Sequence, residues 1–77
     1  MKTFGTNLKK LREELGLTQK EFGQRLGFDA RTISNWEKSR NLPSLIIIKR
    51  INTIYKADYE ELFDIDDEFK IWDKMRI

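Results

Sequence analysis

The side chains best suited to specific chemistry lie in a short stretch, residues 30–41. An arginine such as Arg31 can donate to O6 and N7 of guanine together, and an asparagine such as Asn35 can bond N6 and N7 of adenine. Ser34 can bond either kind of base edge, and Ala30 can touch a thymine methyl group. The same residue types are common on ordinary solvated surfaces, so the elements that hold them must decide between these interpretations.

The spacing of these residues fits one exposed face of a helix. At 100° per residue, Ile33 and Trp36 share an apolar face that would point into a core. The opposite face carries Arg31, Ser34, Asn35 and Lys38. A helix capped by Asp29 would therefore present these polar side chains to solvent together.

Two short helices meeting at a steep angle would hold this face outward, and such a pair needs particular residues at particular places. Gly23 leaves room where the second helix crosses the first, and Gly27 suits the tight turn between them. Phe22, Ile33 and Trp36 can fill the wedge. Gly23 alone would be only a weak helix residue, costing ~1 kcal/mol against Ala. The joint spacing of the five positions predicts a helix-turn-helix.

The flanking segments are also predicted to be helices, so the expected fold class is all-α. Thr3 or Thr6 can cap the first helix, and Gly16 suits its left-handed end. Thr18 can cap the second helix, with Glu21 as its capping-box partner. The apolar stripe of the first helix is expected at Phe4, Leu8, Leu11 and Leu15.

Two further helices are expected in the second half of the chain. Ser44, after Pro43, starts the longer one, and Asp58 caps a short one whose Leu62 and Phe63 pack inward. The buried face of the longer helix is expected at Leu45, Ile48, Ile51 and Tyr55. Residues 45–48 also fit a strand, but no second strand is available to pair with them, which favours a helix.

Composition narrows the class of protein. The chain has 77 residues and neither Cys nor His, which excludes disulfides, thiolate or histidine metal sites and histidine bases. No nucleophile has a nearby base, so no enzyme, cofactor or metal is expected. The longest aliphatic run is far below the ~18–20 residues that span a bilayer. No secretion signal is recognised, so a cytoplasmic protein without a membrane partner is expected.

Charge is divided unevenly along the chain. The net charge is +2, yet residues 1–50 carry +6 and residues 51–77 carry −4. A basic front with an acidic back is typical of a protein that presents one face to a polyanion. An ordinary solvated surface can show the same imbalance.

The segments LKKLREELGLTQKEFGQRLG, TISNWE, NLPSL and ADYEELF together resemble the lambda-repressor-like DNA-binding domain of the Cro/CI or XRE type. The resemblance covers about residues 4–63. It implies a compact five-helix domain whose third helix enters the DNA major groove. It also implies sequence-specific operator binding in transcriptional control, usually as a homodimer.

Phosphate contacts are expected at the rim of this interface. Thr18 and Gln19 lie at the N-terminus of the second helix, where free N–H groups and the dipole favour an anion. The resemblance also marks the position of Gln19 as a phosphate contact. Arg40 and Asn41, after the third helix, can reach the other side of the groove, and Lys38 is assigned to the same role.

Glu37 requires a partner, because a carboxylate in the last turn of a helix meets the negative end of the macrodipole. Arg12 on the first helix is the natural partner, and the matching positions in the resembled family often form a buried pair. An exposed, unpaired Glu37 is the alternative.

Four positions depart from the family pattern. Ser39 and Lys56 stand where glycine is usual, so the turns after the third and fourth helices are expected to be tighter or differently extended. Ile46 and Ile47 stand where the family has polar residues. They indicate a partner surface, unless the tail covers them.

The tail, residues 64–77, lies outside the resemblance, and residues 1–63 are taken as the DNA-binding domain. Ile65, Phe69 and Trp72 fit a sixth helix, although Phe69, Ile71, Met75 and Ile77 also fit the alternation of a strand. We expect the tail to make a dimer or partner contact anchored by Phe69 and Trp72, together with Ile46 and Ile47. A tail folded back on its own domain is the alternative.

The sequence therefore predicts a regulator of transcription that binds double-stranded DNA, expected to be a repressor and a homodimer. The alternative is an antitoxin of the same fold that neutralises a toxin with its acidic tail and binds its own operator.

Overall fold

Five helices follow one another in the computed structural model, which describes residues 4–63. They are α1 (Phe4–Glu14), α2 (Gln19–Leu26), α3 (Ala30–Glu37), α4 (Leu45–Tyr55) and α5 (Tyr59–Phe63). The described residues contain no strand, so the all-α prediction is confirmed, and residues 45–48 belong to a helix. The tail with Phe69 and Trp72 lies outside the described residues, as does Thr3.

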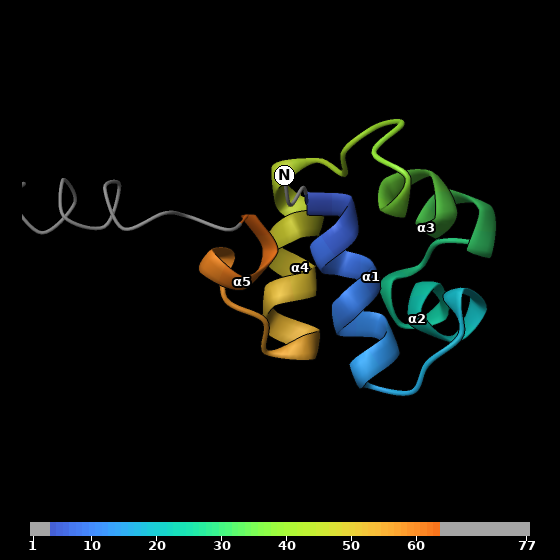
Figure 1. The fold of residues 1–77 in the computed structure, drawn as a ribbon, viewed down its shortest axis with the longest axis horizontal. Coiled ribbons are helices and arrows are strands. Elements are labelled where there is room, and N and C mark those ends of the chain that lie inside the picture. The colour runs from blue at the N-terminus through green and yellow to red at the C-terminus, as the bar shows by residue number, and fades with distance from the viewer. Residues whose placement is uncertain (1–3, 64–77) are drawn as a thin grey trace, which may run out of the picture.

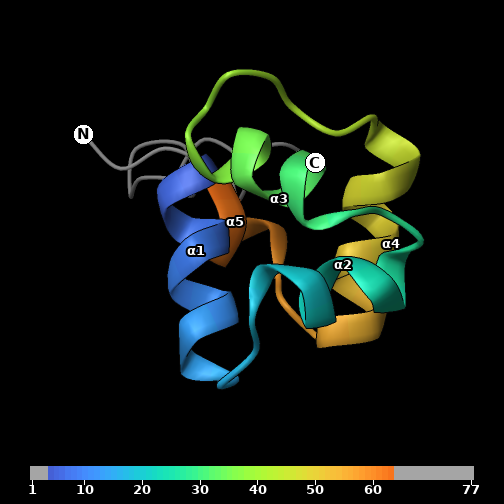
Figure 2. The same ribbon diagram turned by 90° about the vertical axis from the view of Figure 1, so that its right-hand side faces the viewer.

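The helices are arranged so that α2 and α3 lie on the side opposite α5 (Figure 1). Seen from that side, α2 and α3 are framed by α1 and α4 (Figure 2). α3 packs against both α2 and α1, while α5 packs against α1. The side that carries α3 is therefore separated from the acidic C-terminal part of the domain.

Every helix contributes to one core. Its fully buried large side chains are Leu8, Phe22, Leu26, Ile33, Ile51 and Leu62. The rings of Phe22 and Tyr55 stack with centroids 4.2 Å apart, and the Tyr55 hydroxyl donates to the Phe22 carbonyl at 2.7 Å. The ring stacking and the hydroxyl hydrogen bond together hold α2 against α4.

Two expected core positions, Leu15 and Leu45, prove wrong. Leu15 is 46% exposed because α1 ends at Glu14 and the chain turns at Gly16, which has a φ of 69°. Leu17, beyond the turn, packs against the core instead. Leu45 is 73% exposed because it occupies the first turn of α4, ahead of the buried stripe.

Two predictions about the helix ends are also corrected. Thr6 lies inside α1 rather than at its N-cap. Phe63 is partly exposed, although its ring still contacts Phe4 with centroids 5.1 Å apart. At the start of α5, the carbonyl of Asp58 accepts from the backbone N–H groups of Glu61 and Leu62, both at 3.1 Å.

The turns after α3 and α4 keep a left-handed residue without glycine. Ser39 has a φ of 59° and Lys56 a φ of 54°. A side chain in this region is unfavourable by ~1–2 kcal/mol. Both turns are therefore formed against a local preference, not tightened or extended to avoid it.

Candidate nucleic-acid interface

The turn between α2 and α3 is built from the residues that the sequence singled out. The Thr18 hydroxyl accepts from the Glu21 backbone at 3.1 Å, and the Glu21 carboxylate accepts from the Thr18 backbone at 2.9 Å. Gly27 closes α2 with a φ of 86°. A Cβ on Gly23 would lie 2.4 Å from the Phe28 carbonyl oxygen, so the close approach of the two helices requires glycine.

α3 begins at a well-formed N-cap. The Asp29 carboxylate accepts from the Thr32 backbone at 2.8 Å. Hydrogen bonds from Thr32 lower the pKa of Asp29, and the hydrogen bond from the Thr18 backbone lowers that of Glu21. Both carboxylates therefore stabilise their helix starts in the ionised form.

The two faces of α3 differ as expected. Ile33 and Trp36 are buried, and the Trp36 ring meets Phe28 edge-on with centroids 5.0 Å apart. The outward-facing residues are exposed or half-buried: Ala30, Arg31, Ser34, Asn35 and Lys38. The helix thus presents one arginine fork and one amide along a single surface, the donors and acceptors suited to base edges.

The orientation of α3 against α1 depends on a mostly buried ion pair. Arg12 Nε donates to Glu37 Oε2 at 2.6 Å, and Arg12 Nη2 donates to Glu37 Oε1 at 3.2 Å. The side chains are 12% and 3% exposed. This hydrogen bonding raises the pKa of Arg12, and its Nη1 also donates to the Leu17 carbonyl at 2.8 Å.

Gln19 joins the same cluster from α2. Its Nε2 donates to Glu37 Oε1 at 3.1 Å, so one carboxylate connects α1, α2 and α3. This contact fixes the Gln19 side chain at the N-terminus of α2, the position where a phosphate contact was expected. A second Nε2 hydrogen remains for a partner outside the cluster.

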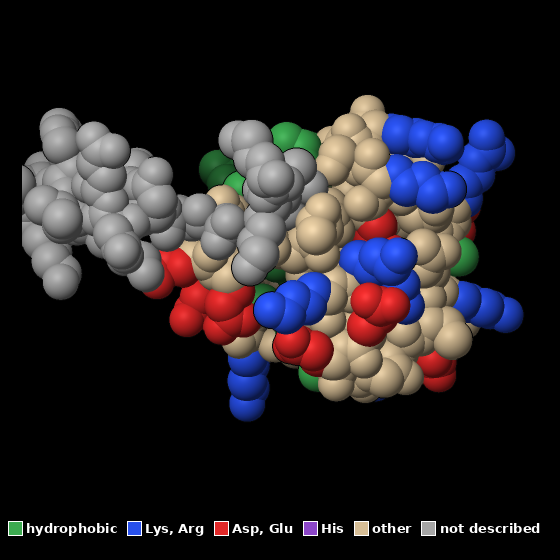
Figure 3. All heavy atoms as spheres, viewed as in Figure 1, with side chains coloured by type: hydrophobic (Ala, Val, Ile, Leu, Met, Phe, Trp, Pro, Cys, Tyr) green, Lys and Arg blue, Asp and Glu red, His purple; other side chains and the backbone are tan. Residues whose placement is uncertain are grey.

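The remaining phosphate candidates lie at the start of α2 and after the end of α3. Thr18 is exposed ahead of α2, while Lys38, Arg40 and Asn41 are exposed after α3. Lys and Arg side chains project along the side formed by α2 and α3, and acidic side chains gather over α5 (Figure 3). Among residues 4–63, the side that carries α3 is therefore the more basic one, which suits a polyanion there.

Comparison with known proteins decides the family. A helix-turn-helix family model of the Cro/CI or XRE type matches residues 8–62. The chain belongs to this family. Its members are DNA-binding regulators of transcription and not enzymes.

Relatives in the helix-turn-helix family span nearly the whole chain. A transcriptional regulator of Archaeoglobus fulgidus, itself uncharacterised, is 35% identical over 69 residues, covering 90% of this chain and 97% of its own. An uncharacterised regulator of Methanothermobacter thermautotrophicus is 39% identical over 64 residues, covering 82% and 93%. The crystal structure of the P22 c2 repressor with a synthetic operator matches with a TM-score of 0.77 and 21% identity. It covers 86% of this chain and all of that one, which shows the same fold.

This helix-turn-helix domain also exposes apolar side chains at the start of α4. Ile46 is 74% exposed, whereas Ile47 is half-buried against the core. Leu42 and Leu45 are exposed nearby in sequence. Of the expected partner contacts, Ile46 is thus available on the surface and Ile47 only partly.

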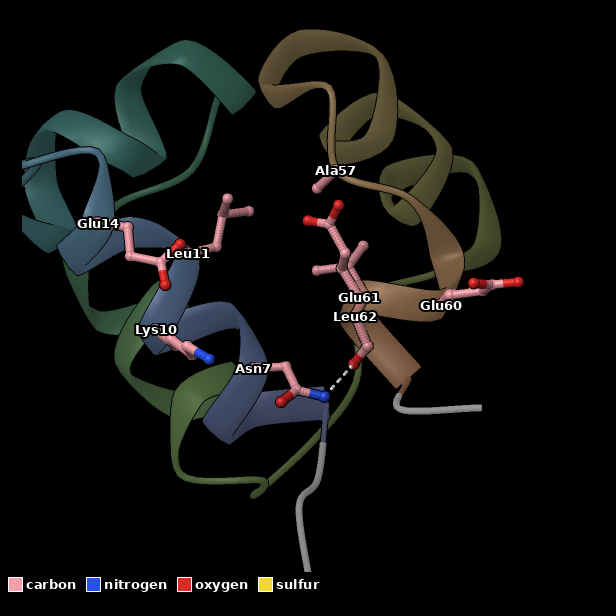
Figure 4. A pocket seen from close by; sticks show the side chains of 8 residues that line it. All are labelled: Asn7, Lys10, Leu11, Glu14, Ala57, Glu60, Glu61 and Leu62. Carbon is pink, nitrogen blue, oxygen red and sulfur yellow. Dashed lines mark hydrogen bonds between the residues drawn. The ribbon is translucent and has the colours of Figure 1, made fainter. Parts of the chain in front are cut away.

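A groove lies on another side of the helix-turn-helix domain, between α1 and α5 (Figure 4). Its lining includes Glu14, Glu60 and Glu61 with one base, Lys10. Asn7 crosses it and donates to the Leu62 carbonyl at 2.9 Å. An acidic lining repels phosphate, so this groove is no part of the DNA interface. In residues 4–63 we find no helix long and apolar enough to cross a membrane and no cluster able to hold a metal ion.

Besides the Gln19–Glu37 hydrogen bond, three contacts that shape the interface were missed by sequence reasoning. Arg50 of α4 donates to the Leu26 carbonyl at the end of α2, at 2.9 Å. A Cβ on Gly5 would lie 2.4 Å from the Trp36 carbonyl oxygen, where α1 crosses the end of α3. Arg40 Nη1 donates to Asn35 Oδ1 at 3.4 Å. Each joins elements distant in sequence or crosses a helix end, and periodicity carries no signal for such contacts.

Proposed function

We propose that this helix-turn-helix protein is a sequence-specific repressor of transcription that reads double-stranded DNA in the major groove with α3. The observation that carries the proposal is the outward face of α3, where Arg31, Ser34 and Asn35 share one surface while Ile33 and Trp36 hold the helix on the core. An α-helix fits the major groove, and these side chains match the base edges displayed there. Ala30, at the exposed start of α3, adds a contact for a thymine methyl group.

Phosphate contacts on either side of α3 would fix its register on the duplex. Gln19, which donates to Glu37, would contact phosphates of one DNA strand together with Thr18. The segment that follows α3 would contact the other strand through Lys38, Arg40 and Asn41. Such contacts act on every DNA sequence alike, and their strength falls as salt concentration rises.

A homodimer is the assembly that gives such a domain enough specificity. One reading helix covers few base pairs, and dimers of this build bind half-sites ~34 Å apart. We assign the dimer contact to Ile46 and Ile47, with Phe69 and Trp72 of the tail as anchors. The exposure of Ile46 and Leu45 supports this assignment, because neighbouring exposed aliphatic side chains are typical of a partner surface.

Binding-site selection on random duplex DNA tests the proposal. If the protein is a repressor, we expect the selection to enrich one sequence, arranged as two inverted half-sites one helical turn apart. We also expect a promoter that contains this sequence to be expressed less when the protein is present. No enriched sequence would refute sequence-specific reading. An enriched sequence that raises expression would refute repression alone.

Co-purification from cells separates the repressor from an antitoxin. The same apolar surface could take a toxin as its partner, with the acidic tail neutralising it. A stable complex with a second protein whose toxicity the chain abolishes would establish the antitoxin role. We assign the protein to the cytoplasm. Recovery of the protein from there only as a homodimer would support the repressor role.

A further inference from the structure

The segment after α3 folds back onto the reading face of that helix. Ser39 adopts a left-handed conformation, and its N–H donates to the Trp36 carbonyl at 3.1 Å. The N–H of Arg40 donates to the Asn35 carbonyl at 3.0 Å. These two bonds form a Schellman motif, which brings the side chains of its first and last residues together, usually as an apolar contact.

In this chain the two residues brought together are polar. Arg40 Nη1 donates to Asn35 Oδ1 at 3.4 Å. Asn35 and Arg40 are therefore joined by two hydrogen bonds, one between their backbones and one between their side chains. A guanidinium has only N–H donors, so the oxygen of the Asn35 amide must be the atom that faces it. The Nδ2 amine of Asn35 is then directed away from Arg40. Together the two side chains offer N–H donors to a partner.

We propose that Asn35 and Arg40 form one base-reading unit that selects guanine. Guanine displays two adjacent acceptors, O6 and N7, in the major groove, whereas adenine and thymine each display one acceptor. Bidentate recognition of adenine needs both a donor and an acceptor on Asn35. Arg40 occupies one of the two lone pairs of the Asn35 oxygen and places its N–H donors beside that oxygen, where they would meet the N6 donor of adenine. The inference rests on the proposed function, because it requires α3 in the major groove, and it gives Arg40 a base-specific role beyond phosphate contact.

Binding-site selection with the full chain and four variants tests this unit. Asn35→Ala identifies the base pair that Asn35 faces, and the unchanged protein is expected to enrich guanine there. Arg40→Met frees the Asn35 amide, so the preference at that position is expected to move from guanine toward adenine by about tenfold. Arg40→Lys keeps the charge without the planar fork and is expected to lose part of the guanine preference. Lys38→Met, the matched loss of a nearby charge, is expected to weaken all sites alike.

The results separate the unit from the function on which it rests. If Arg40→Met weakens guanine and adenine sites by the same factor, Arg40 contacts only phosphate and the unit is refuted. The unit is also refuted if the unchanged protein already selects adenine at the position that Asn35→Ala identifies, or if Arg40→Lys keeps the full preference. A chain that enriches no sequence at all would overturn the proposed function together with the unit.

Discussion

Arg12 of α1 and Glu37 of α3 are joined by two hydrogen bonds, of 2.6 and 3.2 Å, although 25 residues separate them in sequence. The Glu37 side chain is almost wholly buried and also accepts from Gln19. α3 is therefore attached to α1 and α2 through one carboxylate. Its orientation, and with it the direction of the reading face, depends on this cluster.

Removing one partner of this pair is expected to be far more damaging than removing both. Arg12→Met leaves a buried carboxylate without its cation, which typically costs ~3–5 kcal/mol. Arg12→Met with Glu37→Leu replaces the pair by apolar groups and is expected to regain much of that loss. Thermal melts of the two single variants and the double variant form the test cycle. Small and additive effects would contradict a buried, coupled pair.

Much of this arrangement is predictable from local patterns in the sequence. The Thr18–Glu21 capping box, the Asp29 cap and the close approach at Gly23 follow from short-range spacing. The Arg12–Glu37 contact was expected because a carboxylate at a helix end needs a partner and the resembled family supplies one. The two caps satisfy backbone groups that every helix end leaves free, which is why local sequence reveals them.

Other features depend on where helix ends fall in three dimensions. Leu45 continues the apolar stripe of α4, yet it is exposed, because a stripe does not show how far the core extends. The contact of Gln19 with Glu37 and that of Arg50 with the end of α2 arise only once the helices are packed. Packing of this kind leaves no periodic trace in the sequence.

Gly23→Ala is expected to destabilise the domain even though alanine favours helices. The new Cβ would lie 2.4 Å from the Phe28 carbonyl oxygen and 3.0 Å from Ile33 Cγ1. Overpacking costs ~1–3 kcal/mol, and because this clash is with a backbone atom we expect the upper part of that range, above the ~1 kcal/mol gained in helix propensity. The free energy of unfolding of Gly23→Ala in urea is to be compared with that of Gln24→Ala, an exposed substitution on the same helix that is expected to be near neutral. A Gly23→Ala protein as stable as the unchanged one would contradict the close crossing of α2 and α3.

Lys56→Gly is expected to stabilise the domain. Lys56 holds a φ of 54°, which glycine adopts without the steric cost that a side chain meets. Relief of ~1–2 kcal/mol outweighs the ~0.4–1 kcal/mol lost to the greater freedom of glycine in the unfolded chain. Lys49→Gly, inside α4, is the matched control and is expected to lose ~1 kcal/mol. Equal losses from both substitutions would show that the turn carries no strain.

Acid is expected to weaken the two helix starts. The pKa values of Glu21 and Asp29 are lowered in the folded chain by hydrogen bonds from Thr18 and Thr32. A lowered folded-state pKa gives stability that is complete above the unfolded-state pKa and is lost as pH falls through the folded-state value. Unfolding free energy is therefore expected to drop between about pH 5 and pH 3.

The double variant Glu21→Gln, Asp29→Asn is the control for this acid sensitivity. Glutamine and asparagine keep the capping hydrogen bonds but do not titrate. Urea unfolding of this variant is expected to change less over the same pH range than that of the unchanged protein. An identical pH dependence would place the acid-sensitive groups elsewhere.

The most direct test of α3 as the reading helix is the affinity of Arg31→Ala for two duplexes, the selected site and a scrambled site of equal length. Arg31 is exposed on the outward face of α3, and its loss is expected to cost about 1–3 kcal/mol on the selected site and much less on the scrambled one. Gln19→Ala, a phosphate-type change, is expected to weaken both duplexes evenly, and Lys10→Ala, a lost charge at the α1–α5 groove, is expected to change neither much. Equal losses of Arg31→Ala on the two duplexes would contradict the account.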